Sequence, residues 1–220
     1  MLALDELFTP GHTRAWEWLR ECEYPWQIIP QIEDIVLKIG STLDSSLYDH
    51  PSKGIWIAKS AVVSPSACII GPAIIGENTE VRVGAFIRNG VLVGDECVIG
   101  NSAELKNCIL SDRAQVSHLN YVGDSVLGFC AHMGGGAITS NFKSLKTEVV
   151  INDGARIPTG LLKFGVLLGD HAELGCNSVT NPGTIIGAYT IIYPLTSVRG
   201  IIPSYSIVKN RQQQVIEKLT

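Results

Sequence analysis

Two basic side chains have the spacing of a phosphate site. Arg88 and Lys106 each follow an aliphatic residue and are 18 residues apart, the length of one coil of the repeat described below. They are therefore expected one above the other, about 5 Å apart, where like charges repel each other. A bound dianion such as a phosphate would relieve this repulsion, because Arg and Lys both donate to phosphate oxygens. The alternative is that the side chains diverge into water or pair with Glu104.

A histidine is expected close to this basic pair. His118 belongs to the segment Ser117–Tyr121, on the side of the coil that leads into the corner with Lys106. Histidine titrates near neutral pH and can accept a proton during catalysis, so His118 is a candidate general base. The alternative for His118 is a histidine that only faces solvent. Tyr121 could equally be a structural residue in the wall of the β-helix.

Glycines and an asparagine follow one coil later. The run Gly134–Gly136 presents consecutive backbone amides with little side-chain cover, which suits close approach of a ligand oxygen. Asn141 comes about two coils after Lys106 and close to the same column. All these residues are expected along one edge that spans about 15 Å. This convergence predicts a binding or catalytic site.

A repeat of six residues must position these side chains. From Ile57 to Leu105 every sixth residue is Ile, Val or Leu, a period that fits neither a helix nor a simple strand but is typical of a parallel β-helix. Three hexads make one triangular coil of about 18 residues, and coils stack about 4.8 Å apart with the aliphatic residues inward. Glycines 71, 76, 94 and 100 are expected at corners, where sharp turns or positive φ favour glycine.

The repeat is interrupted where the candidate site lies. Aliphatic residues follow after only five residues at Leu110 and again at Leu127, so coils there are about one residue short. The pattern stops between about Asn141 and Gly165, which predicts an arm or loop that leaves the column, and it resumes at Leu168. An arm of that length in a compact domain is typically functional.

The sequence outside the hexads predicts helices. Apolar residues at three- and four-residue spacing indicate a helical N-terminal region over residues 1–50, followed by the β-helix over 51–205 with the arm at about 142–165, and by a C-terminal helix over 206–220. Four aromatic residues of the N-terminal region are expected to pack on the end of the β-helix or on a neighbouring subunit; they are Trp16, Trp18, Tyr24 and Trp26.

Composition restricts the function classes. The chain has 220 residues, 45% hydrophobic and 17% charged, with a formal net charge of -4, which suits one compact domain and argues against nucleic acid as a partner. The first residues lack the basic start of a signal peptide, and no apolar run reaches the length of a membrane helix, so we expect a cytoplasmic protein without a membrane partner. The six cysteines lack CxxC pairing and are expected to be reduced and mostly buried.

At the candidate site the sequence resembles a known family, the acetyltransferase half of the bifunctional N-acetylglucosamine-1-phosphate uridyltransferase/glucosamine-1-phosphate acetyltransferases. Four segments carry the resemblance: residues 81–88, 100–106, 117–124 and 134–142. The resemblance implies a mainly β fold, a single-stranded left-handed parallel β-helix, assembled as a homotrimer with sites between subunits. It also implies acetyl-CoA as co-substrate, an amino-sugar phosphate as acceptor, and no metal.

The resemblance assigns roles to individual residues. It implies that Arg88 and Lys106 hold the sugar phosphate and that Tyr121 and Asn141 contact the sugar. His118 would be the general base. The backbone amide near Gly135 would face the developing oxyanion, and Arg211 matches a basic residue near the coenzyme phosphates.

Four positions depart from the family pattern. His132 replaces an asparagine on the sugar side, which points to a different sugar. On the coenzyme side, Phe142 replaces tyrosine, Cys176 replaces serine and Pro194 replaces alanine. The uridyltransferase half has no counterpart, because residues 1–50 are too short and lack a glycine-rich nucleotide loop.

Three functions are compatible with these patterns. The first is an acetyl-CoA-dependent N-acetyltransferase that acts on an amino-sugar 1-phosphate such as glucosamine-1-phosphate. The second is a non-catalytic trimeric module that partners a sugar nucleotidyltransferase. The third is a zinc hydrolase of the γ-carbonic anhydrase type with His118, His132 and His171 as ligands, although the basic pair would repel a cation.

Overall fold

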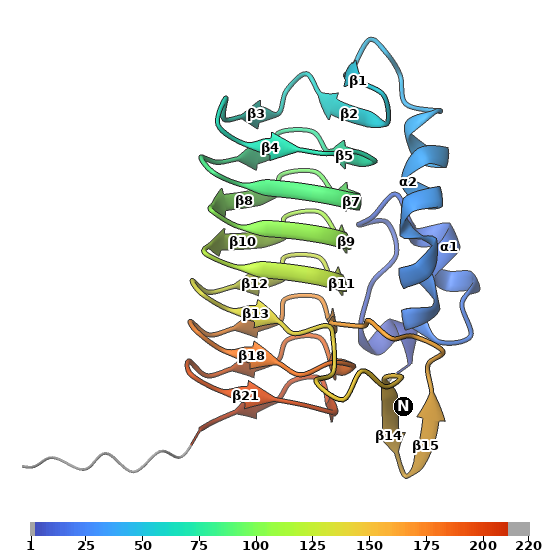
Figure 1. Ribbon diagram of the computed structural model, residues 1–220, viewed down its shortest axis with the longest axis vertical. Helices are drawn as coiled ribbons and strands as arrows, with labels where there is room; N and C mark the ends of the chain where they lie inside the picture. Colours follow the sequence, from blue (N-terminus) through green and yellow to red (C-terminus); the bar gives the residue numbers. More distant parts are fainter. Residues whose placement is uncertain (1–2, 211–220) are drawn as a thin grey trace, which may run out of the picture.

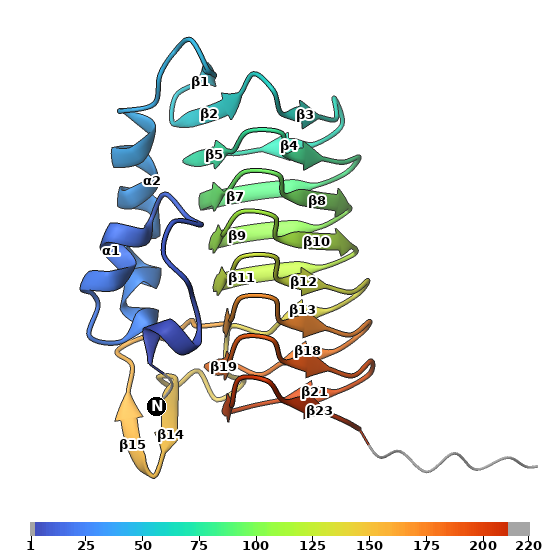
Figure 2. The same ribbon diagram turned by 180° about the vertical axis from the view of Figure 1, so that it is seen from behind.

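The hexads fold into stacked triangular coils that form a left-handed parallel β-helix. A computed structural model describes residues 3–210 and is shown in Figures 1 and 2. One side of the column is the sheet β3-β6-β8-β10-β12-β17-β20-β23, and the others belong to the sheet that includes β7, β9 and β11. The strands are β1 Tyr48–Ser52, β2 Ile55–Ala58, β3 Val62–Val63, β4 Cys68–Ile69, β5 Ala73–Ile75, β6 Glu80–Val81, β7 Phe86–Val93, β8 Val98–Asn101, β9 Glu104–Leu110, β10 Gln115–His118, β11 Tyr121–Leu127, β12 His132–Met133, β13 Ile138–Thr139, β14 Val150–Asp153, β15 Ala155–Pro158, β16 Val166–Leu168, β17 Glu173–Leu174, β18 Val179–Thr180, β19 Thr184–Ile186, β20 Ile191–Ile192, β21 Ser197–Val198, β22 Ile201–Ile202 and β23 Ile207–Val208.

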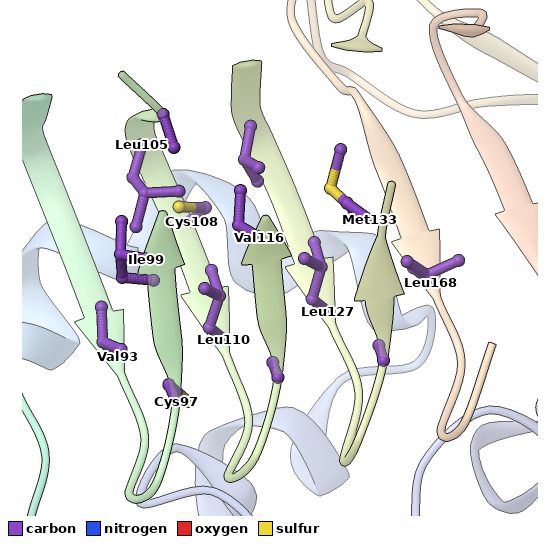
Figure 3. Packing of buried hydrophobic residues seen from close by; sticks show 14 of the residues in the cluster. Val93, Cys97, Ile99, Leu105, Cys108, Leu110, Val116, Leu127, Met133 and Leu168 are labelled. Atoms are coloured by element: carbon purple, nitrogen blue, oxygen red, sulfur yellow. The ribbon is translucent and has the colours of Figure 1, made fainter. Parts of the chain in front are cut away.

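The aliphatic residue of each hexad points into the column. Val93, Ile99 and Leu105 are fully buried in one cluster that continues through Leu110 and Leu127, the positions reached after five-residue steps (Figure 3). Ile87 lies opposite Leu105, so the coil from β7 to β9 has 18 residues. Leu105 lies opposite Val122, so the coil from β9 to β11 has 17 residues and is one residue shorter. The predicted repeat and its shortened coils are confirmed.

The glycines expected at corners serve a different purpose from the one predicted. None of Gly71, Gly76, Gly94 and Gly100 has a positive φ; the left-handed corner positions are held by residues such as Ser102. A Cβ at Gly94 would lie 2.7 Å from the backbone nitrogen of Asp112 in the next coil. These glycines are needed because successive coils approach each other too closely for a side chain.

The N-terminal helices cover one side of the column rather than its end. They are η1 Leu4–Glu6, α1 Trp16–Glu21, η2 Pro25–Gln31 and α2 Ile32–Gly40, and they run alongside the coils (Figures 1 and 2). They pack on a column of outward aliphatic side chains, which comprises Ile74, Leu92, Ile109, Val126, Leu167 and Ile185. Strands that are apolar on both faces require such a cover.

The aromatic cluster belongs to this lateral packing. Trp26 is buried, stacks on Tyr24 with ring centroids 4.6 Å apart, and lies 6.1 Å from the ring of Phe164 at the base of the arm. The expected placement on the end of the β-helix is therefore wrong for this group. A large aromatic ring is buried most fully where helices, sheet and arm meet.

Residues 142–165 leave the column as an arm that contains the antiparallel hairpin β14–β15 (Figure 1). Val149 and Ile151 of the arm are buried with the N-terminal helices in the lateral cluster. At the other end of the chain, Ile207–Val208 form β23 and continue the column. The expected C-terminal helix therefore does not begin at residue 206, and its remainder from 211 onward lies outside the described residues.

Two further expectations concern the state and burial of the cysteines and the presence of membrane-spanning helices. All six cysteines are free thiols, but only Cys97 and Cys108 are buried, while Cys68 and Cys176 are exposed. The expectation that most cysteines are buried is wrong, because several occupy outward or corner positions of the coils. Within residues 3–210, none of the helices combines the length and the apolar character of a membrane span.

Candidate functional site

The two basic residues are neighbours, and each has its own carboxylate. Arg88 lies opposite Lys106 in the ladder between β7 and β9. Arg88 donates to Glu104 Oε1 from Nε and Nη2, at 2.9 and 2.7 Å. Lys106 Nζ donates to both oxygens of Asp124 at 3.0 Å. Arg88 therefore pairs with Glu104, which was the alternative to a bound phosphate. Both positive charges are compensated by carboxylates of the chain, without a ligand.

Asp124 is the centre of a buried polar cluster. Its side chain is only 5% exposed, and that of Lys106 is 12% exposed. The carboxylate also accepts from Asn107 Nδ2 at 2.8 Å and from the Asn141 side-chain amide. The backbone of Asp124 has φ 49°, a left-handed conformation that aspartate tolerates better than most side chains. This conformation and four donated hydrogen bonds fix the carboxylate at the corner where the arm begins.

Tyr121 and Asn141 meet above Gly123. Asn141 Nδ2 donates to Tyr121 Oη at 3.1 Å, and a Cβ at Gly123 would lie 2.7 Å from Asn141 Nδ2 and clash with the Tyr121 hydroxyl. Partial burial raises the pKa of the Tyr121 phenol, which keeps the hydroxyl neutral and able to donate. The structure therefore brings together four of the five acceptor-side residues predicted from the sequence: Arg88, Lys106, Tyr121 and Asn141, without His132.

His118 lies at the corner where β10 leads into β11. It is exposed, and its ring covers Gly135: a Cβ on that residue would lie 2.6 Å from His118 Nε2. The N–H of Gly136 donates to the His118 carbonyl at 3.0 Å. In the described part of the chain, the Gly135 N–H has no hydrogen-bond acceptor. An imidazole and an unpaired backbone donor thus lie side by side, as base and oxyanion donor require.

The same corner continues toward the coenzyme-side residues. Asn177 N–H donates to the Gly135 carbonyl at 2.9 Å, and Leu195 N–H donates to the Cys176 carbonyl at 3.0 Å. His118, Gly135, Cys176 and Pro194 therefore follow one another down a single corner of the column, which we call the His118 corner. Phe142 does not belong to it: this residue lies at the base of the arm and is bridged to Lys163. Arg211 lies outside the described residues.

His132 lies on a different surface from the acceptor-side residues. It projects from β12, where Nδ1 is 2.7 Å from Glu173 Oε2 and Nε2 is 2.9 Å from Ser117 Oγ. His171 is farther along the chain, where its ring stacks on Tyr189 at 4.6 Å. Among residues 3–210 no group of three potential metal ligands is brought together. The three histidines considered as zinc ligands are thus not assembled into one site.

Sequence reasoning named Glu104 as a partner of the basic pair but missed Asp124, the carboxylate at the centre of the polar cluster. Asp124 follows Lys106 by 18 residues, but the coil between β9 and β11 has 17, so Gly123 lies opposite Lys106 and the repeat did not place Asp124 there. It also missed a hollow of about 700 Å³ between the arm and the column. Three cations line this hollow, Lys143, Arg156 and Arg199, and no carboxylate is among the described residues that line it.

Comparison with known proteins identifies the family. A family model described as the GMPPB C-terminal domain matches residues 69–202, which is more than half of the chain and includes every coil that carries the site. The chain belongs to the GMPPB C-terminal domain family. The match spans both the polar cluster and the His118 corner of this GMPPB-type domain.

Curated relatives of the GMPPB-type domain are bifunctional proteins. The Bifunctional protein GlmU of Staphylococcus epidermidis is 34% identical over 147 residues, which is 67% of this chain and 29% of the relative. A bifunctional sugar-1-phosphate nucleotidylyltransferase/acetyltransferase of Sulfurisphaera tokodaii is 34% identical over 151 residues, 60% of this chain and 38% of the relative. The GlmU of Methanococcus maripaludis is 27% identical over 197 residues, 89% of this chain and 48% of the relative. The resemblance to the GlmU acetyltransferase half is confirmed, and the chain spans about a third to a half of the length of these relatives.

Two solved structures resemble the chain at low identity and low TM-score. One is the H141N mutant of perosamine N-acetyltransferase from Caulobacter crescentus in complex with CoA and GDP-perosamine, with 24% identity, a TM-score of 0.37, and coverage of 70% of this chain and 51% of that chain. Another is AntD, an N-acyltransferase from Bacillus cereus in complex with dTDP and 3-hydroxybutyryl-CoA, with 18% identity, a TM-score of 0.38, and coverage of 70% and 74%.

Proposed function

We propose that the chain is an acetyl-CoA-dependent N-acetyltransferase that acts on an amino-sugar 1-phosphate such as glucosamine-1-phosphate. The observation that carries the proposal is the His118 imidazole lying over Gly135, at the corner that leads through β11 into the polar cluster. The relative named as a bifunctional sugar-1-phosphate nucleotidylyltransferase/acetyltransferase supports the acyl-transfer chemistry. The acceptor is inferred from the polar cluster and from the resemblance.

In the proposed reaction His118 accepts the proton that the sugar amine loses as it attacks the thioester carbonyl. Acetyl-CoA supplies the activated acetyl group. The new C–N bond forms as the C–S bond breaks, and the proton is returned to the departing sulfur. The unpaired Gly135 N–H donates to the oxyanion of the tetrahedral intermediate, where charge develops. An exposed imidazole suits this role, because both substrates must reach it from solvent.

The acceptor would lie on Tyr121 and Asn141, with its phosphate toward Arg88 and Lys106. The Arg88 ion pair with Glu104 is about one-third exposed, so Arg88 can exchange Glu104 for a phosphate at little cost. Lys106 is bound to buried Asp124 and contributes mainly by fixing the site. His132 has both ring nitrogens engaged, so a sugar hydroxyl would bind it only in place of Ser117 or Glu173.

The coenzyme would follow the His118 corner. Cys176 and Pro194 are expected to contact its pantetheine portion, because they come next after Gly135 along this corner. Phe142 and Arg211 complete the proposed set of coenzyme-side residues. The cations that line the hollow beside the arm add positive charge near Phe142, which favours phosphate-bearing ligands at this end of the column.

We further propose a homotrimer in which the His118 corner faces a neighbouring subunit. The N-terminal helices cover only one side of the column (Figures 1 and 2), which leaves the corner opposite that side for other subunits. Large apolar side chains are exposed at this corner, namely Val83, Leu119 and Leu195. Exposed apolar groups in one stripe are typical of an interface.

The test is acetyl transfer from acetyl-CoA to glucosamine-1-phosphate, followed by release of the coenzyme thiol. We expect His118→Ala to slow turnover by about 10²–10⁴-fold, whereas His50→Ala, a change at an exposed histidine beside Trp56, should leave turnover unchanged. Undiminished turnover of His118→Ala would remove this residue from the mechanism. Failure of the wild-type chain to acetylate or bind any amino-sugar phosphate would refute the proposed activity.

A second candidate is the non-catalytic trimeric module that partners a sugar nucleotidyltransferase. One observation favours it: the cations of the acceptor site are already compensated by Glu104 and Asp124, as in a structural network. Calorimetric titration with coenzyme A separates the candidates, since the enzyme binds the coenzyme and the module does not.

A further inference from the structure

Ser117, His132 and Glu173 form a connected row across three coils. They project from β10, β12 and β17, where His132 lies directly opposite Glu173 in the parallel ladder. Ser117 Oγ is 2.9 Å from His132 Nε2, and His132 Nδ1 is 2.7 Å from Glu173 Oε2. A serine hydroxyl, an imidazole and a carboxylate joined in this order are the components of a nucleophilic triad.

The hydrogen bonds determine the tautomer of His132. An ionised Glu173 can only accept, so Nδ1 carries the proton of the neutral ring and Nε2 is left as an acceptor. The Ser117 hydroxyl must therefore donate to Nε2, which is the direction required for removal of its proton. His132 and Glu173 are 33% and 50% exposed, so the row is accessible to a solute.

Two members of the row, His132 and Glu173, line a hollow with room for a small ligand. An open hollow of about 680 Å³ is lined by Glu96, Arg113, Gln115, Cys130, His132 and Glu173. Arg113 is bound to Glu96, whereas the Gln115 side chain has no partner in the part of the chain that the structure describes. Gln115 lies two residues before Ser117 on β10, on the same outward face. Its amide can therefore donate to an oxyanion that forms beside Ser117.

We propose that Ser117, His132 and Glu173 are a second catalytic centre, which cleaves short-chain acyl esters or thioesters through an acyl-serine intermediate. Ser117 Oγ attacks the carbonyl carbon and gives its proton to His132, the bond to the leaving group breaks, and His132 returns the proton to the leaving oxygen or sulfur. Water then attacks the acyl-serine with His132 as base, which releases the carboxylic acid and restores Ser117. Glu173 orients His132 throughout. A polar hollow without a large apolar side chain fits an acetyl-sized group.

This centre is distinct from the proposed acetyl transfer. Ser117 and His118 are adjacent in the chain, but the Ser117 hydroxyl is bound to His132 on the sheet face, whereas His118 covers Gly135 at the corner. Acetylation of an amino sugar requires His118 and not Ser117. Each activity can therefore fail independently of the other.

The experiment combines p-nitrophenyl acetate hydrolysis with fluorophosphonate labelling of the full chain, and the labelled peptide is identified by mass spectrometry. We expect one label on Ser117, its loss in Ser117→Ala and His132→Gln, and a rate of labelling at least about tenfold lower in Glu173→Gln. Ser66→Ala removes another serine of the β-helix and should leave the label unchanged.

Two measurements separate this centre from a merely structural hydrogen-bond network. Glu173→Gln keeps the shape of the side chain, and its melting temperature tells whether a lost label reflects unfolding. His118→Ala should abolish acetyl transfer and retain the Ser117 label. Absence of the label from the wild-type chain, or a label that persists in folded His132→Gln, would overturn the proposal.

Discussion

Replacement of Lys106 by Met tests the buried ion pair at the centre of the site. The methionine keeps the length of the side chain but leaves the Asp124 carboxylate, only 5% exposed, with amide donors alone. Breaking a buried pair from one side costs about 3–5 kcal/mol, because an uncompensated charge stays buried. For a urea m-value of about 2 kcal/mol/M, the midpoint of unfolding should fall by roughly 1.5–2.5 M.

Arg88→Met is the matched control. Arg88 is the next cation in the same column, and its pair with Glu104 is about one-third exposed, so its loss should cost only about 0–1 kcal/mol. The double variant Lys106→Met/Asp124→Asn removes both charges and should recover part of the loss. The reasoning is refuted if Lys106→Met and Arg88→Met shift the urea midpoint equally, since Asp124 would then be solvated or compensated by other groups.

Two further predictions concern the His118 corner and the thiols. Gly135→Ala places a methyl group 2.6 Å from His118 Nε2 and should lower the kcat of acetyl transfer by at least about tenfold with little change in the melting temperature; unchanged kcat would mean that His118 acts from another position. Burial raises the pKa of Cys97 to about 12 and also raises the pKa of Cys108, so these two thiols should react with Ellman's reagent only after unfolding, and rapid reaction in the native chain would contradict their burial. Since the folded chain holds the Cys97 proton more tightly, this contribution to stability is complete below the ordinary thiol pKa of 9.0 and is lost as pH rises toward 12, as urea unfolding at several pH values would measure.

The column could be predicted from the sequence because each hexad contributes one residue to a continuous core. Leu105, Leu110 and Leu127 are buried in the predicted register, since a slip of one residue would turn every aliphatic side chain outward. The lateral position of the helices was not predicted, although Ile74, Leu92 and Ile109 carry the signal. Each lies between two inward residues, and such continuous apolar triplets indicate strands that are covered on both faces.

The site could be predicted only as a set of neighbours. The repeat length placed Arg88 beside Lys106, but charge compensation depends on side-chain direction and on backbone φ. Asp124 reaches Lys106 because its backbone adopts φ 49° at the corner, a conformation that spacing alone does not specify. The row of Ser117, His132 and Glu173 was missed for a related reason: its members are 15 and 41 residues apart, because the arm separates β12 from β17.

The N-terminal helices determine which corner of the column can be a site. A triangular column has three sides, and the lateral cluster buries Ile74, Leu92 and Ile185 along one of them. The corner opposite that side, where β10 leads into β11, is therefore farthest from the helices (Figure 2). It carries His118 and Gly135 and is open to solvent or to another subunit. The arm leaves the column beside the polar cluster and packs back onto the N-terminal helices through Val149. The packing that covers the helix-bearing side of the column therefore also fixes the arm next to the proposed acceptor site. Stability of the lateral cluster and geometry of the site are for this reason expected to be coupled.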